Sequence, residues 1–315
     1  MRPTVSIVMP TFNRPQFLPA TLDSVFAQTL TDWELIVADD GSDDATRNYL
    51  RKITARPQVT ALWLEHSGRP AVATNAAMRE ARGEYVAFLD SDDLWLPEKL
   101  ARQVASLRHH ARCGWSYTRF MTIDSSGRII NPLPTGTYPA KGGWIRESLL
   151  DGRIVIAQPS VLVSRTLLEE LGPFDEGLRM CYDDDLWFRL AARSEVDAVN
   201  EPLTLIRRHG SHSGSDVIAW EDRLRVFERL LSQERRSPSA RLLRSQRAAH
   251  AAGLARSQAA SGERIRALAT LLSSVPHSLR YRRWWPNALR AVARALAPPV
   301  VVSLVRARRR ARASR

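Results

Sequence analysis

The stretch Tyr85–Asp93 reads YVAFLDSDD, an apolar run followed at once by three aspartates. The apolar residues predict a buried strand, on which side chains two positions apart project from the same face. Asp90 and Asp92 therefore project together at the carboxyl end of the strand, where open α/β sheets bind ligands. Carboxylates this close repel one another unless a cation joins them, and Mg²⁺-type sites typically combine one or two carboxylates with substrate phosphates. The stretch thus predicts a metal–phosphate site.

Strand and helix patterns alternate on the amino-terminal side of this stretch. Such alternation is typical of a parallel sheet with right-handed crossovers, which places all four strand ends on one edge. That edge would gather Thr11, Asp39, Asp40, Asp90 and Asp92. The expected strands are Thr4–Met9, Glu34–Ala38, Val59–Leu64 and Tyr85–Asp90, and the expected helices include Asp44–Ile53 and Ala71–Arg82.

The middle of the chain is more mixed. A helix is expected over Leu94–His109, with Asp93 as its cap, and Asn13 is expected to cap the helix that carries Leu18 and Leu22. Later expected elements are a strand over Trp115–Ile123, a loop-rich excursion over Asp124–Lys141, a strand within Ile154–Val163 and helices over Arg165–Leu171 and Asp183–Arg193. After Trp220 the pattern is helical and rich in arginine.

The net charge of +13 is unevenly distributed along the 315 residues. Residues 220–315 contain 22 arginines and five acidic residues, a net charge of +17, whereas residues 1–219 have a net charge of −4. We therefore expect two domains, one over 1–219 and a helical, basic extension over 220–315. Two cysteines cannot form a disulfide framework, and Val5–Met9 is too short for a signal peptide. Both observations favour a cytoplasmic location.

Each acidic cluster has two interpretations. Asp39-Asp40-Gly41-Ser42 is either a turn with a helix cap or a site for the hydroxyl and N–H groups of a nucleoside. Asp90-Ser91-Asp92-Asp93 is either a helix cap or a cation site that would hold a diphosphate. Tyr182-Asp183-Asp184-Asp185 opens a helix, where the macrodipole stabilises acids, but a carboxylate there also suits a general base for a reacting hydroxyl.

Two basic segments are equally ambiguous. His209, in the run from Arg207 to Ser213, is either structural or a contact to a metal or a diphosphate. The tail combines Arg282-Arg283-Trp284-Trp285 with six arginines between 306 and 315. It is either a solvated basic end or an interfacial segment on an anionic membrane surface. The sequence has no recognised nucleic-acid-binding motif, so nucleic acid is not an expected partner.

Together these motifs resemble those of the family 2 (GT2) glycosyltransferases with the GT-A fold. The resemblance runs from Val5 to about Ser213 and follows the family's order of motifs. It implies an α/β fold with a Rossmann-like, mostly parallel central sheet flanked by helices. The matching segments are Ser6–Arg14, Gln28–Ser42, Gly83–Asp93 with the DXD metal motif, and Gly172–Glu176 followed by Asp183–Leu190.

The resemblance also implies roles for individual residues. Asp183 would be the catalytic base, Asp40 the nucleobase contact and Asp92 the main ligand of a Mn²⁺ or Mg²⁺ ion, with Asp90 in support. His209 is a further candidate metal ligand. The other expected contacts to the nucleotide sugar are Pro10, Thr11, Asn13, Arg14, Asp39, Asn75, Ser91 and the DXD residues Asp90 and Asp92.

Two residues depart from the family pattern. Tyr182 stands where the family usually has a glutamate directly before the base, so the surroundings of the base differ. Thr74 stands where the family has an arginine, which removes a contact to the nucleotide or its phosphates. Arg69 and Arg14 are candidates to replace that contact.

The implied activity is inverting, metal-dependent transfer from a nucleoside-diphosphate sugar, a UDP-sugar by default, to a hydroxyl of a glycan or lipid-linked acceptor. We also expect a role in cell-surface polysaccharide synthesis. The tail is expected to attach the protein peripherally to the cytoplasmic face of the membrane. A nucleotidyltransferase is one alternative, but it needs a glycine-rich phosphate loop and residues 10–19 contain no glycine. A non-catalytic nucleotide-binding module is the other, and it would not need Asp183.

Overall fold

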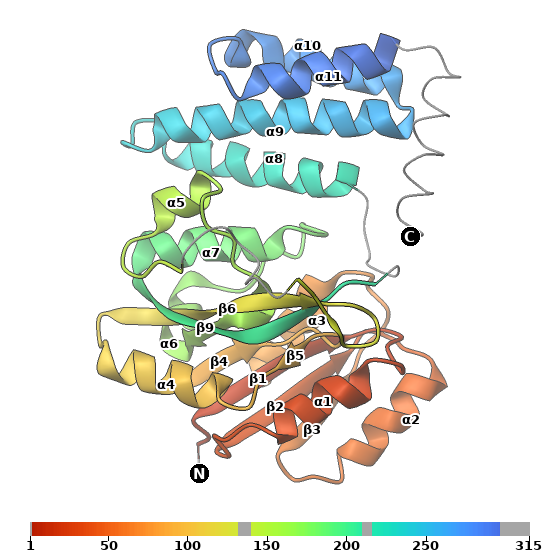
Figure 1. Ribbon diagram of the computed structural model, residues 1–315, viewed down its shortest axis with the longest axis vertical. Coiled ribbons are helices and arrows are strands. Elements are labelled where there is room, and N and C mark those ends of the chain that lie inside the picture. Colours follow the sequence, from red (N-terminus) through yellow and green to blue (C-terminus); the bar gives the residue numbers. More distant parts are fainter. Residues whose placement is uncertain (1, 132–139, 210–215, 297–315) are drawn as a thin grey trace. The chain divides into compact units, whose positions relative to one another are not determined.

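A computed structural model describes residues 2–131, 140–209 and 216–296 of the chain (Figure 1). The chain divides into two compact units, residues 1–213 and residues 214–315. Parts of three expected features lie outside the described residues. These are residues 132–139 of the loop-rich excursion, the end of the segment from Arg207 to Ser213, and the arginines between 306 and 315.

The first unit is built on a single sheet, nine-stranded over the described residues. As predicted, its first four strands in the chain run parallel to one another. β8 is antiparallel to both β4 and β6, so a parallel half continues into a mixed half. The strand order is β3 (Val59–Trp63), β2 (Trp33–Asp39), β1 (Val5–Thr11), β4 (Tyr85–Phe88), β8 (Val161–Ser164), β6 (Cys113–Ile123), β9 (Glu195–Arg207) and β5 (Leu94–Trp95), with β7 (Ile129–Asn131) paired to β6.

The helices of this unit cover both faces of the sheet. Alternation along β1 sends Val5, Ile7 and Met9 into one buried cluster with apolar residues of α1, α2 and α4. Phe88, on the other face of the sheet, packs against Trp187 of α7. The helices are α1 (Leu18–Phe26), α2 (Asp44–Ile53), α3 (Pro70–Glu80), α4 (Lys99–His109), α5 (Arg146–Leu150), α6 (Arg165–Leu171) and α7 (Tyr182–Arg193), with a 3₁₀ turn, η1, at Gln158–Ser160.

Two expected helix starts were wrong. Leu94 and Trp95 form strand β5 against β9, and helix α4 begins only at Lys99. Pro97 explains the delay, because a proline disfavours helical geometry at the residue before it. Asp93 is therefore not a helix cap, and its carboxylate instead accepts a hydrogen bond from the backbone N–H of Arg207 at 2.7 Å.

Asn13 was also expected to cap a helix, but α1 begins at Leu18 with Phe17 at its N-cap. Asn13 has a positive φ of 50°, and its side-chain oxygen accepts a hydrogen bond from the backbone N–H of Asp43 at 2.7 Å. It thus ties the loop after β1 to the start of α2. The expected bounds of α2 and α6, by contrast, are confirmed residue for residue.

The second unit consists, over residues 216–296, of α8 (Asp216–Gln233), α9 (Ala240–Ser261), α10 (Arg264–Ser278) and α11 (Trp284–Leu296). Figure 1 shows α9 between α8 on one side and α10 and α11 on the other. Small residues allow this close packing: a Cβ atom at Gly253 would lie 2.7 Å from the ring of Trp220. The expected helical character is confirmed. None of the described helices combines the length and the apolar character that crossing a membrane requires.

The neighbouring tryptophans of α11 have different environments. Trp284 is buried, and its indole N–H donates to Ser274 Oγ at 3.0 Å, so its ring packs inside the second unit. Trp285 is 43% exposed and begins an apolar stripe at helical spacing, which continues through Leu289, Val292 and Leu296.

Candidate functional site

The end of β4 brings residues from three parts of the first unit together. Asp92 lies in a turn in which the Asp93 N–H donates to the Asp90 carbonyl at 3.2 Å. Its Oδ2 atom is 2.9 Å from Nε2 of His209, at the end of β9, and 3.4 Å from Nε of Arg14, after β1. The expected metal and diphosphate residues Asp92, Arg14 and His209 are therefore adjacent.

The cluster carries more negative charge than its surroundings stabilise. Burial, followed by the charge of Asp92, raises the pKa of Asp90 to about 7, although Arg14 opposes the shift. Burial, with the charges of Asp90 and Asp92, also raises the pKa of Asp93 well above its usual value. A positive charge bound here would relieve this repulsion.

The donor set suits a divalent cation only in part. Among the described residues, no three acidic, histidine or cysteine side chains converge as a complete metal site. Asp92 and Asp90 provide two carboxylates, and hard cations commonly take one or two carboxylates and complete their shell with water and phosphate oxygens. The residues therefore fit a metal that binds together with a phosphate-bearing ligand.

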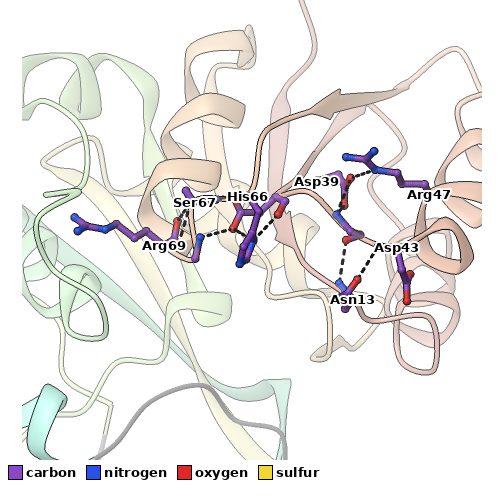
Figure 2. Close-up of polar contacts among 10 residues, drawn as sticks. Asn13, Asp39, Asp43, Arg47, His66, Ser67 and Arg69 are labelled. Carbon is purple, nitrogen blue, oxygen red and sulfur yellow. Dashed lines mark hydrogen bonds and ion pairs between the residues drawn. The ribbon is translucent and has the colours of Figure 1, made fainter.

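Asp40, at the end of β2, organises the loop that follows β3. Its carboxylate accepts hydrogen bonds from the N–H and hydroxyl of Ser67, at 2.9 and 2.8 Å, and from the N–H of Gly68 at 3.0 Å. Nδ1 of His66 lies 2.8 Å from the Asp40 carbonyl oxygen. Figure 2 shows these contacts beside those of Asp39 and Asn13.

Asp39 anchors the start of α2 instead of facing this loop. Its buried carboxylate accepts hydrogen bonds from the Ser42 N–H at 3.2 Å and from Nε of Arg47 at 2.9 Å. Glycine is required at position 41, directly after the two aspartates, because the φ of Gly41 is +80° and a Cβ atom would lie 2.8 Å from His66. Asp39 thus has a structural environment, whereas Asp40 lies on the loop side.

Two features beside Asp40 suit a planar ligand. Phe12 and His66 stack with ring centroids 4.0 Å apart, and Phe12 is 37% exposed. Thr11 Oγ1, at the end of β1, is buried and has no hydrogen-bond partner among the described residues. No sequence pattern pointed to His66 or Ser67, because the loop after β3 reaches Asp40 only through the pairing of β2 with β3.

The first turn of α7 is held at the same end of the sheet as Asp90. Trp187 packs on Phe88 and stacks on Trp115, with ring centroids 5.9 and 6.2 Å apart. Asp183 lies four residues before Trp187, on the same face of the helix. Asp90 follows Phe88 by two positions and so leaves the strand on the same side. The geometry therefore places the expected base near the expected metal ligands.

The electrostatics of Tyr182 agree with this placement. Burial raises the pKa of its phenol well above the usual value, and the charges of Asp90, Asp183 and Asp92 raise it further. The side chain of Gln158, in η1, opposes this rise in the pKa of the phenol, and Gln158 Nε2 is buried without a hydrogen-bond partner in the described chain. Tyr182 thus stands among the three carboxylates as a neutral group.

The other two acids of this turn differ from Asp183. Asp185 is buried and pairs with Nε of Arg189 at 3.0 Å. Arg189 also donates to the carbonyl oxygens of Leu171 and Gly172, so Asp185 helps to hold the segment before α7. Asp184 is half-buried and lies about 100° around the helix from Asp183.

The side chain of Asn75 contacts the turn before α7. Its side-chain amide donates to the Phe174 carbonyl at 3.0 Å and to Glu176 Oε1 at 2.9 Å, and its oxygen accepts from the Phe174 N–H at 3.0 Å. Arg69 likewise donates to the Glu176 carbonyl at 2.7 Å. The structure shows a role for Asn75 in fixing this turn, and its contact to a nucleotide stays a prediction.

Strand pairing fixes the position of Pro10, and a hydrogen bond to its backbone carbonyl fixes that of Ser91. Pro10 is buried at the end of β1, in register with Ala38 of β2. Ser91 is buried, and its carbonyl oxygen accepts a hydrogen bond from Thr21 Oγ1 at 3.2 Å. Both positions border the edge where the strand ends gather, and their contacts to a donor stay predictions.

Comparison with known proteins agrees with this geometry. The model of the family described as "Glycosyl transferase family 2" matches residues 6–171. The UDP-Glc:alpha-D-GlcNAc-diphosphoundecaprenol beta-1,3-glucosyltransferase WfgD of Escherichia coli is 30% identical over 196 residues, 62% of this chain and 73% of that protein. The putative teichuronic acid biosynthesis glycosyltransferase TuaG of Bacillus subtilis is 38% identical over 129 residues, 40% of this chain and half of that protein's length.

Solved structures with similar folds extend the likeness to the second unit. The crystal structure of S. aureus TarS 1–349 in complex with UDP has a TM-score of 0.65 at 19% identity, covering 93% of this chain and 88% of that one. The mannosyltransferase PcManGT from Pyrobaculum calidifontis, in complex with GDP-Man and Mn²⁺, has a TM-score of 0.58 at 20% identity, covering 94% and 87%. The expected GT-A-like α/β fold with a helical carboxyl-terminal region is confirmed.

Proposed function

Because the chain belongs to glycosyl transferase family 2 and is thus a glycosyltransferase, we propose that it uses a nucleoside-diphosphate sugar and inverts the configuration at the anomeric carbon of the transferred sugar. The observation that carries this proposal is the meeting of α7 with the end of β4. There the pKa of the buried Tyr182 phenol is raised by the charges of Asp183, Asp90 and Asp92. A base and a diphosphate site at such close range are what a single displacement at a sugar carbon requires.

The nucleoside is proposed to bind beside Asp40. The exposed face of the Phe12–His66 stack offers an aromatic surface for a base. The Thr11 hydroxyl, which has no hydrogen-bond partner among the described residues, suits ribose or base N–H and O–H groups, and the Asp40 carboxylate can accept from the same kinds of group. UDP is the default nucleotide, since the E. coli relative is named for UDP-Glc and TarS was solved with UDP.

The diphosphate is proposed to bind at the Asp92 cluster. Asp92 and Asp90 would hold a Mn²⁺ or Mg²⁺ ion, with His209 as a candidate third contact. When bound, the cation would stabilise negative charge on the departing diphosphate. Arg14, 3.4 Å from Asp92, adds a fixed positive charge beside the same group.

The acceptor is proposed to react from the side of α7. The acceptor hydroxyl loses its proton to the Asp183 carboxylate as its oxygen forms the new bond to the sugar carbon. The bond from that carbon to the diphosphate oxygen breaks on the opposite face, so the configuration inverts. Asp183 ends the step protonated, and the nucleoside diphosphate leaves with the electron pair.

The acceptor class is proposed to be a glycan or a lipid-linked sugar used in cell-surface polysaccharide synthesis. Support comes from the names of two relatives, which refer to teichuronic acid and to a diphosphoundecaprenol-linked sugar. A nucleotidyltransferase and a non-catalytic nucleotide-binding module are disfavoured by the family match and by Asp183 beside the cluster.

A panel of nucleotide sugars tests the proposed function. UDP-, dTDP- and GDP-linked sugars, each with Mn²⁺ or Mg²⁺, are expected to give one class of donor that raises the melting temperature of the protein. Adding EDTA should remove that increase, because the diphosphate would lose its cation. No shift with any donor, or turnover that is unaffected by EDTA, would contradict the donor or the metal assignment respectively.

Peripheral attachment to the cytoplasmic face of the membrane is proposed to use α11. Its exposed apolar stripe begins two residues after Arg283 and consists of Trp285, Leu289, Val292 and Leu296. An apolar face beside arginines suits the surface of an anionic leaflet.

Replacing both Leu289 and Leu296 with glutamine is expected to weaken binding to phosphatidylglycerol vesicles about tenfold or more, because two leucines no longer enter the interface. Co-sedimentation measures this effect. The matched control is Asn287→Gln, a half-buried position on the side of α11 that faces away from the stripe. Equal vesicle binding by the double variant and the control would contradict the attachment.

A further inference from the structure

A cavity of about 620 Å³ lies among α8, α9 and α10 of the second unit. No carboxylate is found among its described lining residues. Four arginines line it, namely Arg235, Arg244, Arg247 and Arg280. Its volume lies within the range of about 300–1,000 Å³ that is typical of small-molecule sites. The cavity is therefore large enough for an organic molecule and is positively charged.

The arginines are only partly neutralised. Arg247 pairs with Glu228 at 3.0 Å, and Arg244 donates to the backbone carbonyl of Arg235 at 3.0 Å. Within the described part of the chain, no ion pair joins Arg235, Arg244 or Arg280 to a carboxylate. The cavity thus presents guanidinium groups that favour a phosphate, which arginine binds through paired N–H donors.

A buried hydroxyl in the same wall also points to a ligand. Ser278 is 1% exposed, and its Oγ atom has no hydrogen-bond partner in the described chain. Buried hydroxyl groups are normally paired, so the unpartnered Ser278 suits a polar atom of a bound molecule. The backbone N–H of Tyr281 bonds to the Ser278 carbonyl and thereby holds the residue in the wall.

The rest of the wall is apolar and is formed by Leu231, Val275, Pro276 and Leu279. A bare phosphate would leave this surface uncovered, whereas an organic phosphate would cover it. The chain's own tail is a poor occupant of this positively charged cavity, because residues 297–315 contain six arginines and no acidic residue.

We propose that this cavity binds an organic phosphate, in which a phosphate or diphosphate group carries an apolar chain. The phosphate oxygens accept hydrogen bonds from Arg244, Arg280 and the Ser278 hydroxyl, and the apolar chain lies against Leu231 and Val275. Such chemistry occurs both in lipid headgroups and in free organic phosphates. The inference stands independently of the reaction proposed for the first unit.

Calorimetric titration of the full chain with geranyl diphosphate and with pyrophosphate tests the proposal. EDTA is present throughout, so that metal-dependent binding of diphosphates in the first unit is suppressed. Geranyl diphosphate is expected to bind at least about tenfold more tightly than pyrophosphate, because its chain covers the apolar wall. Arg280→Gln and Arg244→Gln are each expected to weaken this binding about tenfold or more.

Arg241→Gln is the matched control, since Arg241 is an exposed arginine on α9 that does not line the cavity. Ser278→Ala, which removes only the hydroxyl, should weaken binding without lowering the melting temperature. Failure of geranyl diphosphate to bind, equal binding of the two probes, or equal losses in Arg280→Gln and Arg241→Gln would overturn the proposal.

Phosphatidylglycerol vesicles distinguish the two sources of the phosphate. Competition between vesicles and geranyl diphosphate would support a lipid headgroup as the ligand. Undiminished titration in the presence of vesicles would support a free organic phosphate.

Discussion

Asp183→Asn is expected to lower the rate of nucleoside-diphosphate release from the donor by about 10²–10⁴-fold, the usual contribution of a general base. The amide keeps the size of the carboxylate but cannot accept the proton of the acceptor hydroxyl. Donor binding should change little, because the proposed nucleoside and diphosphate contacts lie at Asp40 and Asp92. Initial rates at saturating donor, together with a donor titration, separate these two effects.

Asp184→Asn provides the matched control for this variant. Asp184 occupies the same helical turn and is half-buried, but its side chain leaves the helix about 100° away from that of Asp183. Its replacement changes the charge of the turn by the same amount, so any general loss of helix-dipole stabilisation appears in both variants. A rate loss of equal size in the two variants, or loss of donor binding in Asp183→Asn, would contradict the assignment of the base.

Local sequence patterns were sufficient for the parallel half of the sheet. Each of the first four strands is a short apolar run, and the runs of β1, β2 and β4 are followed at once by Pro10, Asp39 and Asp90. Each crossover helix also has its own apolar face. α2 is predictable to the residue because Asp43 caps it and Ile53 closes its apolar stripe. The acidic strand ends could be located for the same reason, since a strand end is a local feature.

Contacts between distant segments were not predictable. β9 contains Glu195, Asp197, Glu201 and Pro202, which obscure its strand pattern, and it is stabilised by pairing with β6. The same applies to Asn75, because its partners lie 99 and 101 residues away along the chain. Side chains such as His66 and Gln158 reach the candidate site only after these long-range pairings form.

The departure at Tyr182 illustrates how one substitution alters a site. A glutamate there, as is usual in the family, would place a fourth carboxylate beside Asp90, Asp92 and Asp183. The phenol stays neutral, since burial and those three charges raise its pKa well above the usual value. The site therefore carries one negative charge fewer at the position next to the proposed base.

Asp92→Asn is expected to weaken metal-dependent binding of the nucleoside diphosphate by about 10–100-fold, the range seen when contacts that support a metal site are removed. Asparagine keeps a side-chain oxygen near His209 and Arg14 but removes the negative charge that would hold the cation. Calorimetric titration with UDP, or with the nucleotide that the donor panel identifies, measures the affinity with Mn²⁺ and with EDTA.

Asp93→Asn is the control for Asp92→Asn because Asp93 is the neighbouring carboxyl and is buried against the backbone of Arg207. Burial raises the pKa of Asp93 well above its usual value, so a negative charge is less favourable on this carboxyl than on an exposed one. The amide oxygen of this variant can still accept the hydrogen bond that the Arg207 N–H donates to Asp93 at 2.7 Å. Asp93→Asn should therefore bind UDP and Mn²⁺ almost as the unaltered protein does. If the two variants lose affinity equally, or if EDTA leaves the affinity of the unaltered protein unchanged, Asp92 is not the metal ligand.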